Sequence, residues 1–126
     1  MTSPAARISV IIPALNEMAS IGLVIGEIPR DLASEIIVVD NGSTDATAEV
    51  ARQAGARIVT EPHRGYGAAC LAGIAATRSP DIIAFLDGDY SDYPEELRQV
   101  RVTPRKLIFM FVFRMALIYT MHLNII

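Results

Sequence analysis

The sequence predicts an α/β fold in which helices cover both faces of a parallel sheet. Short β-branched runs alternate with helix-like segments at the spacing of βαβ units, which have right-handed crossovers. The runs are apolar throughout rather than alternating, which is typical of strands covered on both faces. At 126 residues, 52% of them hydrophobic and 20% charged, the chain is expected to form at most one domain of ordinary size.

Four strands and their connecting helices follow from this pattern. The strands are expected over residues 8–12, 35–39, 57–60 and 81–86. The helices are expected at about residues 17–28, 45–54 and 68–77, with a further helical turn opened by Pro94. Asn16 can cap the first helix, Pro29 stops it, and Gly55 suits the C-terminal end of the second.

Each expected strand is followed at its carboxyl end by polar, turn-forming residues. These segments are PALNE, DNGSTD, EPHRGYG and DGDYSD, beginning at residues 13, 40, 61 and 87. In open α/β sheets, ligands bind beyond the carboxyl ends of the strands. The sequence therefore places the functional site at this edge of the sheet.

The loop after the fourth strand carries three carboxylates, those of Asp87, Asp89 and Asp92. Like charges this close repel unless a cation lies among them, and Gly88 lets the backbone bend so that the first two converge. Mg²⁺ or Mn²⁺ is usually held by one or two carboxylates while phosphates and water fill the other positions. A D-x-D pair alone leaves a metal–diphosphate site and a plain turn open. For Asp92 we favour a helix cap, with Glu95 three residues on.

Other classes of site fit the spacing poorly. An EF-hand beginning at Asp87 would need Gly at its sixth position, where the chain has Asp92. No Walker A motif is present, and Gly65-x-Gly67-x-x-Cys70 lacks the third small residue of a dinucleotide fingerprint. A net charge of −3 gives no electrostatic reason to expect a nucleic acid.

Compartment and targeting can also be read from the composition. A single cysteine, Cys70, excludes an internal disulfide framework and fits a reducing compartment. The N-terminal apolar run is too short and too interrupted by proline for a secretory signal. A cytoplasmic location is expected, with association to the inner face of the membrane if the C-terminal tail acts as an anchor.

Four segments together resemble the family 2 glycosyltransferases with a GT-A fold. They are VIIPALNE, IIVVDNGSTDAT, RGYGAACLAGI and IIAFLDGDYSDYPEEL, at residues 10–17, 36–47, 64–74 and 82–97. Their order and spacing are family-like, and the resemblance spans about residues 7–100. The branch that transfers sugars to polyprenyl or dolichyl phosphate is the most similar one.

This resemblance implies roles for particular residues. The nucleotide-sugar would contact Pro13, Ala14, Asn16, Glu17, Asp40, Gly42, Ser43, Arg64, Gly65, Gly67, Asp87 and Gly88. Asp87 and Asp89 would be catalytic through a Mg²⁺ or Mn²⁺ ion, with Asp89 as the principal ligand. Ser91 aligns with a polar position that sometimes assists the metal. Plain turn formation remains an alternative for Gly65 and Gly67, and helix capping is favoured for Thr44 and Asp45.

The chemistry implied is displacement at the anomeric carbon of a UDP- or GDP-sugar, with inversion. The cation would neutralise charge on the departing nucleoside diphosphate. A lipid-phosphate acceptor would already carry a nucleophilic oxyanion at neutral pH. A sugar hydroxyl acceptor would instead need a carboxylate base.

The chain divides by composition into residues 1–100, the nucleotide-sugar-binding half, and an atypical tail over residues 101–126. All 14 acidic residues lie at or before Glu96, whereas the tail carries four basic residues and none that is acidic. The family continues past the D-x-D loop with an acceptor-shaping half that this tail does not resemble. One interpretation is a marginal membrane segment over residues 107–126, with Arg114 near its middle. The other is an abnormal end from a truncated or frame-slipped gene.

The sequence thus leads to three functional hypotheses. The first is a glycosyltransferase donor domain with weak or no transfer, because its acceptor half is truncated. The second is a non-catalytic subunit that binds nucleotide-sugar, anchored at the membrane or assembled as an oligomer through its tail. The third is a flavodoxin-like phosphate-binding protein without metal dependence.

Overall fold

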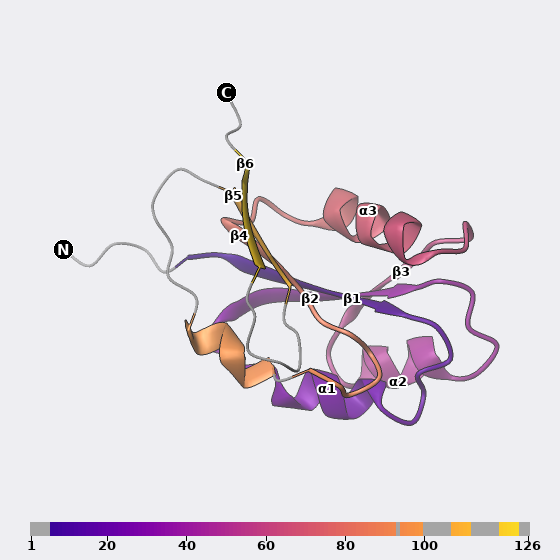
Figure 1. Ribbon diagram of the computed structural model, residues 1–126. Helices are drawn as coiled ribbons and strands as arrows, with labels where there is room; N and C mark the ends of the chain where they lie inside the picture. Colours follow the sequence, from indigo (N-terminus) through magenta and orange to yellow (C-terminus); the bar gives the residue numbers. More distant parts are fainter. Residues whose placement is uncertain (1–5, 93, 100–106, 112–118, 124–126) are drawn as a thin grey trace.

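A computed structural model describes residues 6–92, 94–99, 107–111 and 119–123. Within these residues a single sheet has the strand order β3-β2-β1-β4-β5-β6 (Figure 1). The strands are β1 (Ile8–Ala14), β2 (Ala33–Asp40), β3 (Arg57–Thr60), β4 (Ile82–Phe85), β5 (Leu107–Phe111) and β6 (Tyr119–Leu123). All neighbouring pairs are parallel except β5 and β6, which are antiparallel.

Helices cover both faces of this sheet, as the sequence predicts. The helical elements are α1 (Ile21–Glu27), α2 (Thr47–Gln53), α3 (Tyr66–Ala76) and the 3₁₀ helix η1 (Pro94–Gln99). In Figure 1, α3 lies on one side of the sheet, while α1, α2 and η1 lie on the other. The predicted α/β class is confirmed, because the central strands are parallel and each crossover carries a helix.

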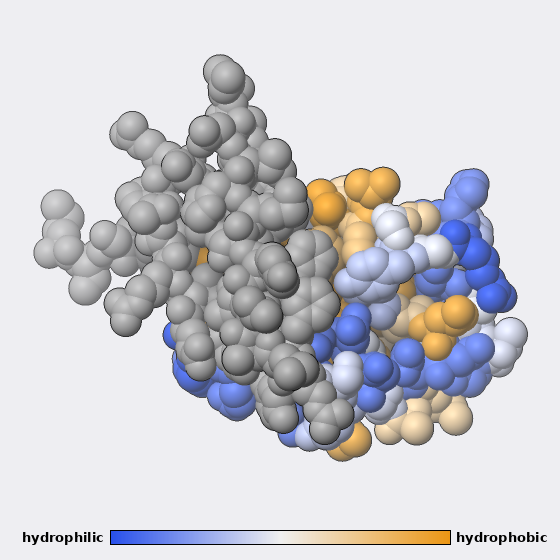
Figure 2. Space-filling view, viewed as in Figure 1, coloured by the Kyte–Doolittle hydropathy of each residue, from blue (hydrophilic) through white to orange (hydrophobic). Residues whose placement is uncertain are grey.

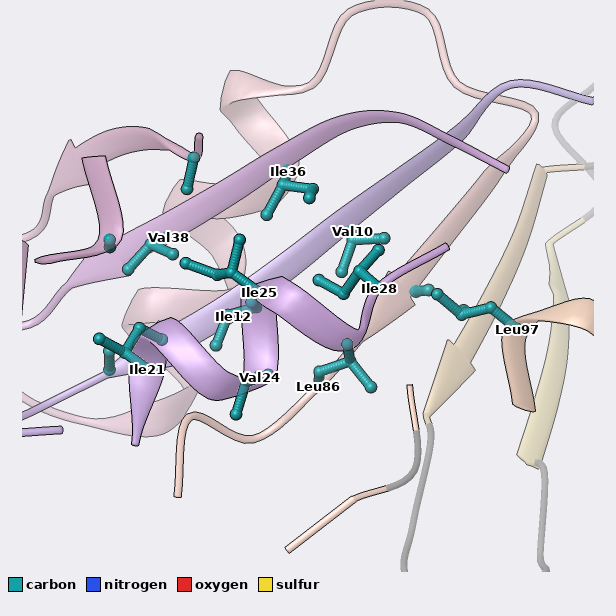
Figure 3. Close-up of a cluster of buried hydrophobic side chains, with 14 of the residues drawn as sticks. Val10, Ile12, Ile21, Val24, Ile25, Ile28, Ile36, Val38, Leu86 and Leu97 are labelled. Carbon is teal, nitrogen blue, oxygen red and sulfur yellow. The ribbon is translucent and has the colours of Figure 1, made fainter. Parts of the chain in front are cut away.

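Strand β1 supplies side chains to two separate cores. Val10 and Ile12 point toward α1 and pack in a cluster with Ile21, Ile25 and other apolar side chains (Figure 3). Ile11, one position along, belongs to a second cluster on the α3 side. Alternate residues of a strand point to opposite faces, so a continuous apolar run fills both cores.

Helix α3 lies unusually close to the sheet. A Cβ atom on Gly73 would be only 2.5 Å from Cγ2 of Ile11 and 3.2 Å from Cγ2 of Val39. The outer surface over α3 is also apolar (Figure 2), and the side chain of Leu71 is 68% exposed there. The glycine therefore sets the distance between helix and sheet, and hence the position of the start of α3 at the functional edge.

The first helix is shorter than the sequence predicts. We expected it over residues 17–28 with Asn16 as its cap, but α1 begins at Ile21 and Ser20 occupies the cap position without a side-chain bond. Asn16 has a φ of 52°, and its backbone N–H donates to Ser43 Oγ at 2.9 Å. The cap prediction was wrong because the Asn16 side chain and amide are bound by the loop after β2. The expected end of the second helix is confirmed, since Gly55 follows α2 with a φ of 104°.

The C-terminal tail contributes two strands within its described residues. β5 pairs with β4, and β6 pairs with β5. The sequence analysis expected no strand beyond residue 86, because the family resemblance ended near residue 100. Across the part of the chain that the structure describes, no helix is long and apolar enough to cross a bilayer. The interpretation of this tail as an abnormal end stays a prediction.

The close packing at Gly73 generates a stability prediction. Gly73→Ala should lower the free energy of unfolding by about 1–3 kcal/mol, because the added methyl group overlaps Ile11. Gly26→Ala is the matched control: it also lies in a helix, but its Cβ would meet nothing within 4 Å. That change should stabilise the protein by about 0.5–1 kcal/mol. Urea unfolding measures both, and equal effects of the two variants would contradict the packing model.

Candidate functional site

The loops that follow β1, β2, β3 and β4 enclose a cavity at the carboxyl edge of the sheet. Its volume is about 400 Å³. The lining residues are Pro13, Ala14, Leu15, Glu17, Asn41, Arg64, Gly65, Tyr66, Ala69, Asp87, Gly88 and Asp89. The cavity forms here because the parallel strands end at one edge, and β2 and β4 lie on either side of β1.

Eight of the residues expected in the site do line this cavity. They are Pro13, Ala14, Glu17, Arg64, Gly65, Asp87, Gly88 and Asp89. The other expected residues, Asn16, Asp40, Gly42, Ser43 and Gly67, are not among its lining residues in the described part of the chain. The four from the first two loops belong instead to the layer that holds the cavity wall in place.

That supporting layer joins the loop after β1 to the loop after β2. Asn16 Oδ1 accepts the Thr44 backbone N–H at 2.8 Å, and Ser43 Oγ accepts the Asn16 backbone N–H. Asp45 Oδ1 accepts the backbone N–H of Thr47, the first residue of α2, at 2.9 Å, which fits its expected role at that helix start. Asp40 Oδ1 accepts the Ser43 backbone N–H at 2.9 Å and so closes the turn.

The acidic loop is held by hydrogen bonds from outside and from within. Ser20 Oγ, at the start of α1, donates to the Gly88 carbonyl at 2.6 Å. Asp92 Oδ2 accepts the Asp87 backbone N–H at 2.7 Å, and Asp89 Oδ1 accepts the backbone N–H and the hydroxyl of Ser91. Asp92 therefore closes the acidic loop, a role that the expectation of a helix cap did not include.

Gly88 lets two walls of the cavity approach each other. A Cβ atom at this position would lie 3.3 Å from Glu17 Cγ. Glu17 and the two aspartates therefore face one space, and their charges interact. Burial and the nearby Asp89 carboxylate raise the pKa of Asp87 above its usual value. Burial, followed by the charges of Asp89 and Asp87, raises the pKa of Glu17.

The donor set suits a hard divalent cation that shares its coordination with a ligand. Raised pKa values mark a site where negative charge is destabilised, and a cation would relieve that cost. Among the described residues, no group of three or more His, Cys, Asp or Glu side chains is arranged to hold a metal ion. Two carboxylates would therefore need phosphate and water oxygens to complete an octahedral shell, as is common for Mg²⁺.

Arg64 brings positive charge to the same cavity. Its Nε atom lies 3.5 Å from the position that a Cβ of Gly42 would occupy, so the guanidinium lies over that glycine. Gly42 has a φ of 97°, which favours glycine. None of the ion pairs in the described part of the chain involves Arg64, so its charge is available to an anion.

Sequence reasoning missed five residues of the site. Leu15, Asn41, Tyr66 and Ala69 line the cavity, and Ser20 holds Gly88. Three of the lining residues lie inside the recognised segments, so adjacency to a predicted position was the available signal. Burial and a contact with Cys70 raise the pKa of Tyr66, which keeps its phenol protonated. Nothing in the local sequence distinguishes Ser20, whose partner is 68 positions away.

Residues 9–101 match the model of the family described as Glycosyl transferase family 2. The chain belongs to glycosyltransferase family 2. The family and its GT-A fold, both inferred from four sequence segments, are confirmed.

Mycobacterial glycosyltransferases are among the relatives with high identity. An uncharacterized glycosyltransferase of Mycobacterium tuberculosis is 45% identical over 84 residues, which cover 67% of this chain and 37% of that protein. Glucosyl-3-phosphoglycerate synthase of Mycolicibacterium smegmatis is 41% identical over 96 residues, which cover 68% of this chain and 31% of that protein. The chain thus spans a little over a third, or less, of the length of these curated relatives.

Solved structures of the same kind superpose on the chain. Glucosyl-3-phosphoglycerate synthase of M. tuberculosis matches with a TM-score of 0.66 and 39% identity, covering 74% of this chain and 38% of that one. Its complex with Mn²⁺, UDP-glucose and phosphoglyceric acid matches with a TM-score of 0.61 and 42% identity, covering 66% and 33%.

The raised pKa of Asp87 generates a prediction about stability and pH. A folded-state pKa above the unfolded value means that the ionised carboxylate destabilises the fold at neutral pH. Asp87→Asn should therefore raise the melting temperature at pH 7 in EDTA. The gain should shrink as pH falls through the raised pKa and vanish below about 4, where both states are protonated. Thermal denaturation from pH 3 to 8 measures it; a gain independent of pH would contradict the electrostatic cause.

Proposed function

We propose that this chain binds a UDP-sugar together with Mn²⁺ or Mg²⁺ and acts as the donor-binding part of a glycosyltransferase. The observation that carries the proposal is the pairing of opposite charges in one cavity. Asp87 and Asp89 line it from the loop after β4, and Arg64 lines it from the loop after β3. These loops lie on the two sides of β1 in the strand order, so a metal-bound diphosphate could contact both.

Asp89 and Asp87 would hold the metal, with Asp89 as the principal ligand. When bound, the cation would supply Lewis-acid stabilisation of the departing nucleoside diphosphate. Ser20 keeps the Gly88 carbonyl fixed between the two carboxylates, which limits how far either aspartate can move. Arg64 would contact the diphosphate, and a guanidinium suits phosphate oxygens because it donates in a planar fork. UDP with Mn²⁺ in the solved relative supports this choice of donor and metal.

The loops after β1 and β2 would contact the nucleoside. Pro13, Ala14 and Glu17 line the cavity from the first loop. Asp40 would accept the imide N–H of uracil: one of its oxygens binds the Ser43 amide, and a carboxylate has further lone pairs to offer. Asn16, Gly42 and Ser43 would act by fixing the shape of this loop pair.

The acceptor would carry a phosphate monoester. The sequence alone favoured polyprenyl phosphate, whereas a similar solved structure holds phosphoglyceric acid beside UDP-glucose and Mn²⁺. Both ligands present a phosphate oxyanion, which is a nucleophile in the one case and a recognition group in the other. The identity to glucosyl-3-phosphoglycerate synthases favours the small phosphorylated acid. Transfer by this chain would be slow, because it spans only 31% of that relative.

Calorimetry with UDP in the presence of Mn²⁺ tests the donor proposal. Binding should be metal-dependent, and Asp89→Asn should weaken it at least about tenfold, because the variant removes a metal ligand. Glu49→Gln is the matched control, since this side chain lies exposed on α2 in an ion pair with Arg52. It should leave UDP affinity unchanged. If wild type fails to bind UDP with Mn²⁺ or with Mg²⁺, the proposed function is wrong.

A transfer assay distinguishes the two acceptors. Wild-type chain is incubated with UDP-glucose and Mn²⁺, and UDP release is followed with 3-phosphoglycerate or with a short-chain polyprenyl phosphate. We expect slow release above the hydrolysis background with phosphoglycerate alone. Stimulation by the polyprenyl phosphate alone would restore the acceptor class that the sequence first favoured. Asp87→Asn should reduce any stimulated rate to background.

A further inference from the structure

The buried amide of Asn41 joins two loops that no backbone ladder connects. Asn41 directly follows β2 and is only 6% exposed. Its Nδ2 donates to the carbonyls of Glu61 at 2.9 Å and His63 at 2.7 Å. Its Oδ1 accepts the backbone N–H of Gly65 at 3.0 Å. One side chain thus holds three backbone groups of the loop between β3 and α3.

This loop needs such a holder because the sheet does not reach it. The ladder between β2 and β3 ends at the pair Asp40 and Thr60, and one further bond joins the Glu61 N–H to the Asp40 carbonyl at 3.0 Å. The next helical bond begins only at Gly65, whose carbonyl accepts the Ala69 N–H. Between these points the His63 carbonyl and the Gly65 amide both bond to Asn41, so its side chain replaces the missing ladder.

Asparagine matches this task because its amide has two donors and one acceptor on a short side chain. The two donors and the acceptor are all used, and no buried side-chain N or O atom in the described residues lacks a partner. An aspartate has the same shape but offers only acceptors when ionised, so it would turn oxygen toward two carbonyls. An alanine would leave all three backbone groups without this partner.

The loop held by Asn41 delivers two cavity residues. Arg64 lies between the two anchored positions His63 and Gly65, and its guanidinium lies over Gly42. Gly65 has a φ of 127° at the start of α3, a conformation that favours glycine and turns the chain into the helix. The position of the Arg64 side chain therefore depends on bonds made by a residue in a different loop.

We infer that Asn41 is a positioning residue that presents Arg64 to the diphosphate of the bound nucleotide. The binding part of this inference rests on the proposed function, in which Arg64 contacts the phosphates. The structural part does not: Asn41 fixes the loop of residues 61–65 whether or not a nucleotide is bound. Asn41 thus acts through Arg64 rather than through contact with the reacting atoms.

A double-mutant cycle in the full chain tests the binding part. Asn41→Ala should weaken UDP binding with Mn²⁺ about tenfold in the wild-type background. In the Arg64→Ala background the same change should cost less than about twofold, because the residue it positions is gone. UMP, which lacks the second phosphate, should lose less affinity than UDP. An equal loss in both backgrounds would overturn the inference, since it would show general damage to the cavity.

Hydrogen exchange in the ligand-free protein tests the structural part. In Asn41→Ala the Gly65 amide should exchange at least about tenfold faster than in wild type, while amides of β1 and α1 keep their rates. Unchanged Gly65 exchange would refute the role of Asn41 even if UDP binds. If wild type binds no UDP but Gly65 exchange rises, the proposed function fails and the structural part stands.

Two further variants guard against misfolding and charge effects. Asn41→Asp keeps the shape and the acceptor for Gly65, and it should still weaken UDP binding because the two carbonyl bonds are lost. His63→Asp adds the same charge on the same loop at a side chain that is 87% exposed, and it should weaken UDP binding less. If both Asn41 variants lose the native fold, Asn41 is a folding residue and the inference is wrong.

Discussion

The structure depends on the burial of β1 between two parallel neighbours. β1 pairs with β2 along seven of its residues and with β4 along four, and its apolar side chains serve the cores on both faces. A strand enclosed in this way cannot carry a polar side chain without a partner. Its polar partners therefore gather beyond the carboxyl ends, where four loops meet. The cavity is a consequence of where the apolar strands stop.

Side-chain bonds between loops convert this meeting point into a defined site. Ser20 joins the first loop to the fourth, Ser43 joins the second to the first, and Asn41 joins the second to the third. Each bond runs from a short polar side chain to the backbone of another loop. Short side chains lose little conformational entropy when they are fixed, so such bonds can hold a loop at modest cost. The backbone positions of the cavity wall then depend on residues that need not touch a ligand.

The charges in the cavity work against the stability of the ligand-free fold. Asp87 is partly buried close to Asp89, and both burial and the neighbouring charge raise its pKa. Asn41 and Ser20 hold the surrounding backbone, so these charges cannot easily separate. A site that keeps unfavourable charges together is prepared for a cation and an anion that bring their own opposite charges. Membership of glycosyltransferase family 2 gives this arrangement a chemical purpose.

The sequence by itself determined the strands, their parallel order of helices and strands, and the family, because these follow from apolar runs and from motifs in linear order. It also placed Asp87, Gly88, Asp89 and Arg64 at the cavity. It did not determine that Asn16 would bind Thr44 instead of capping a helix, or that residues 107–111 and 119–123 would extend the sheet. Nor did it reveal Asn41 or Ser20. Their partners lie 20 to 68 positions away, and only the parallel packing of strands brings such groups within hydrogen-bonding distance.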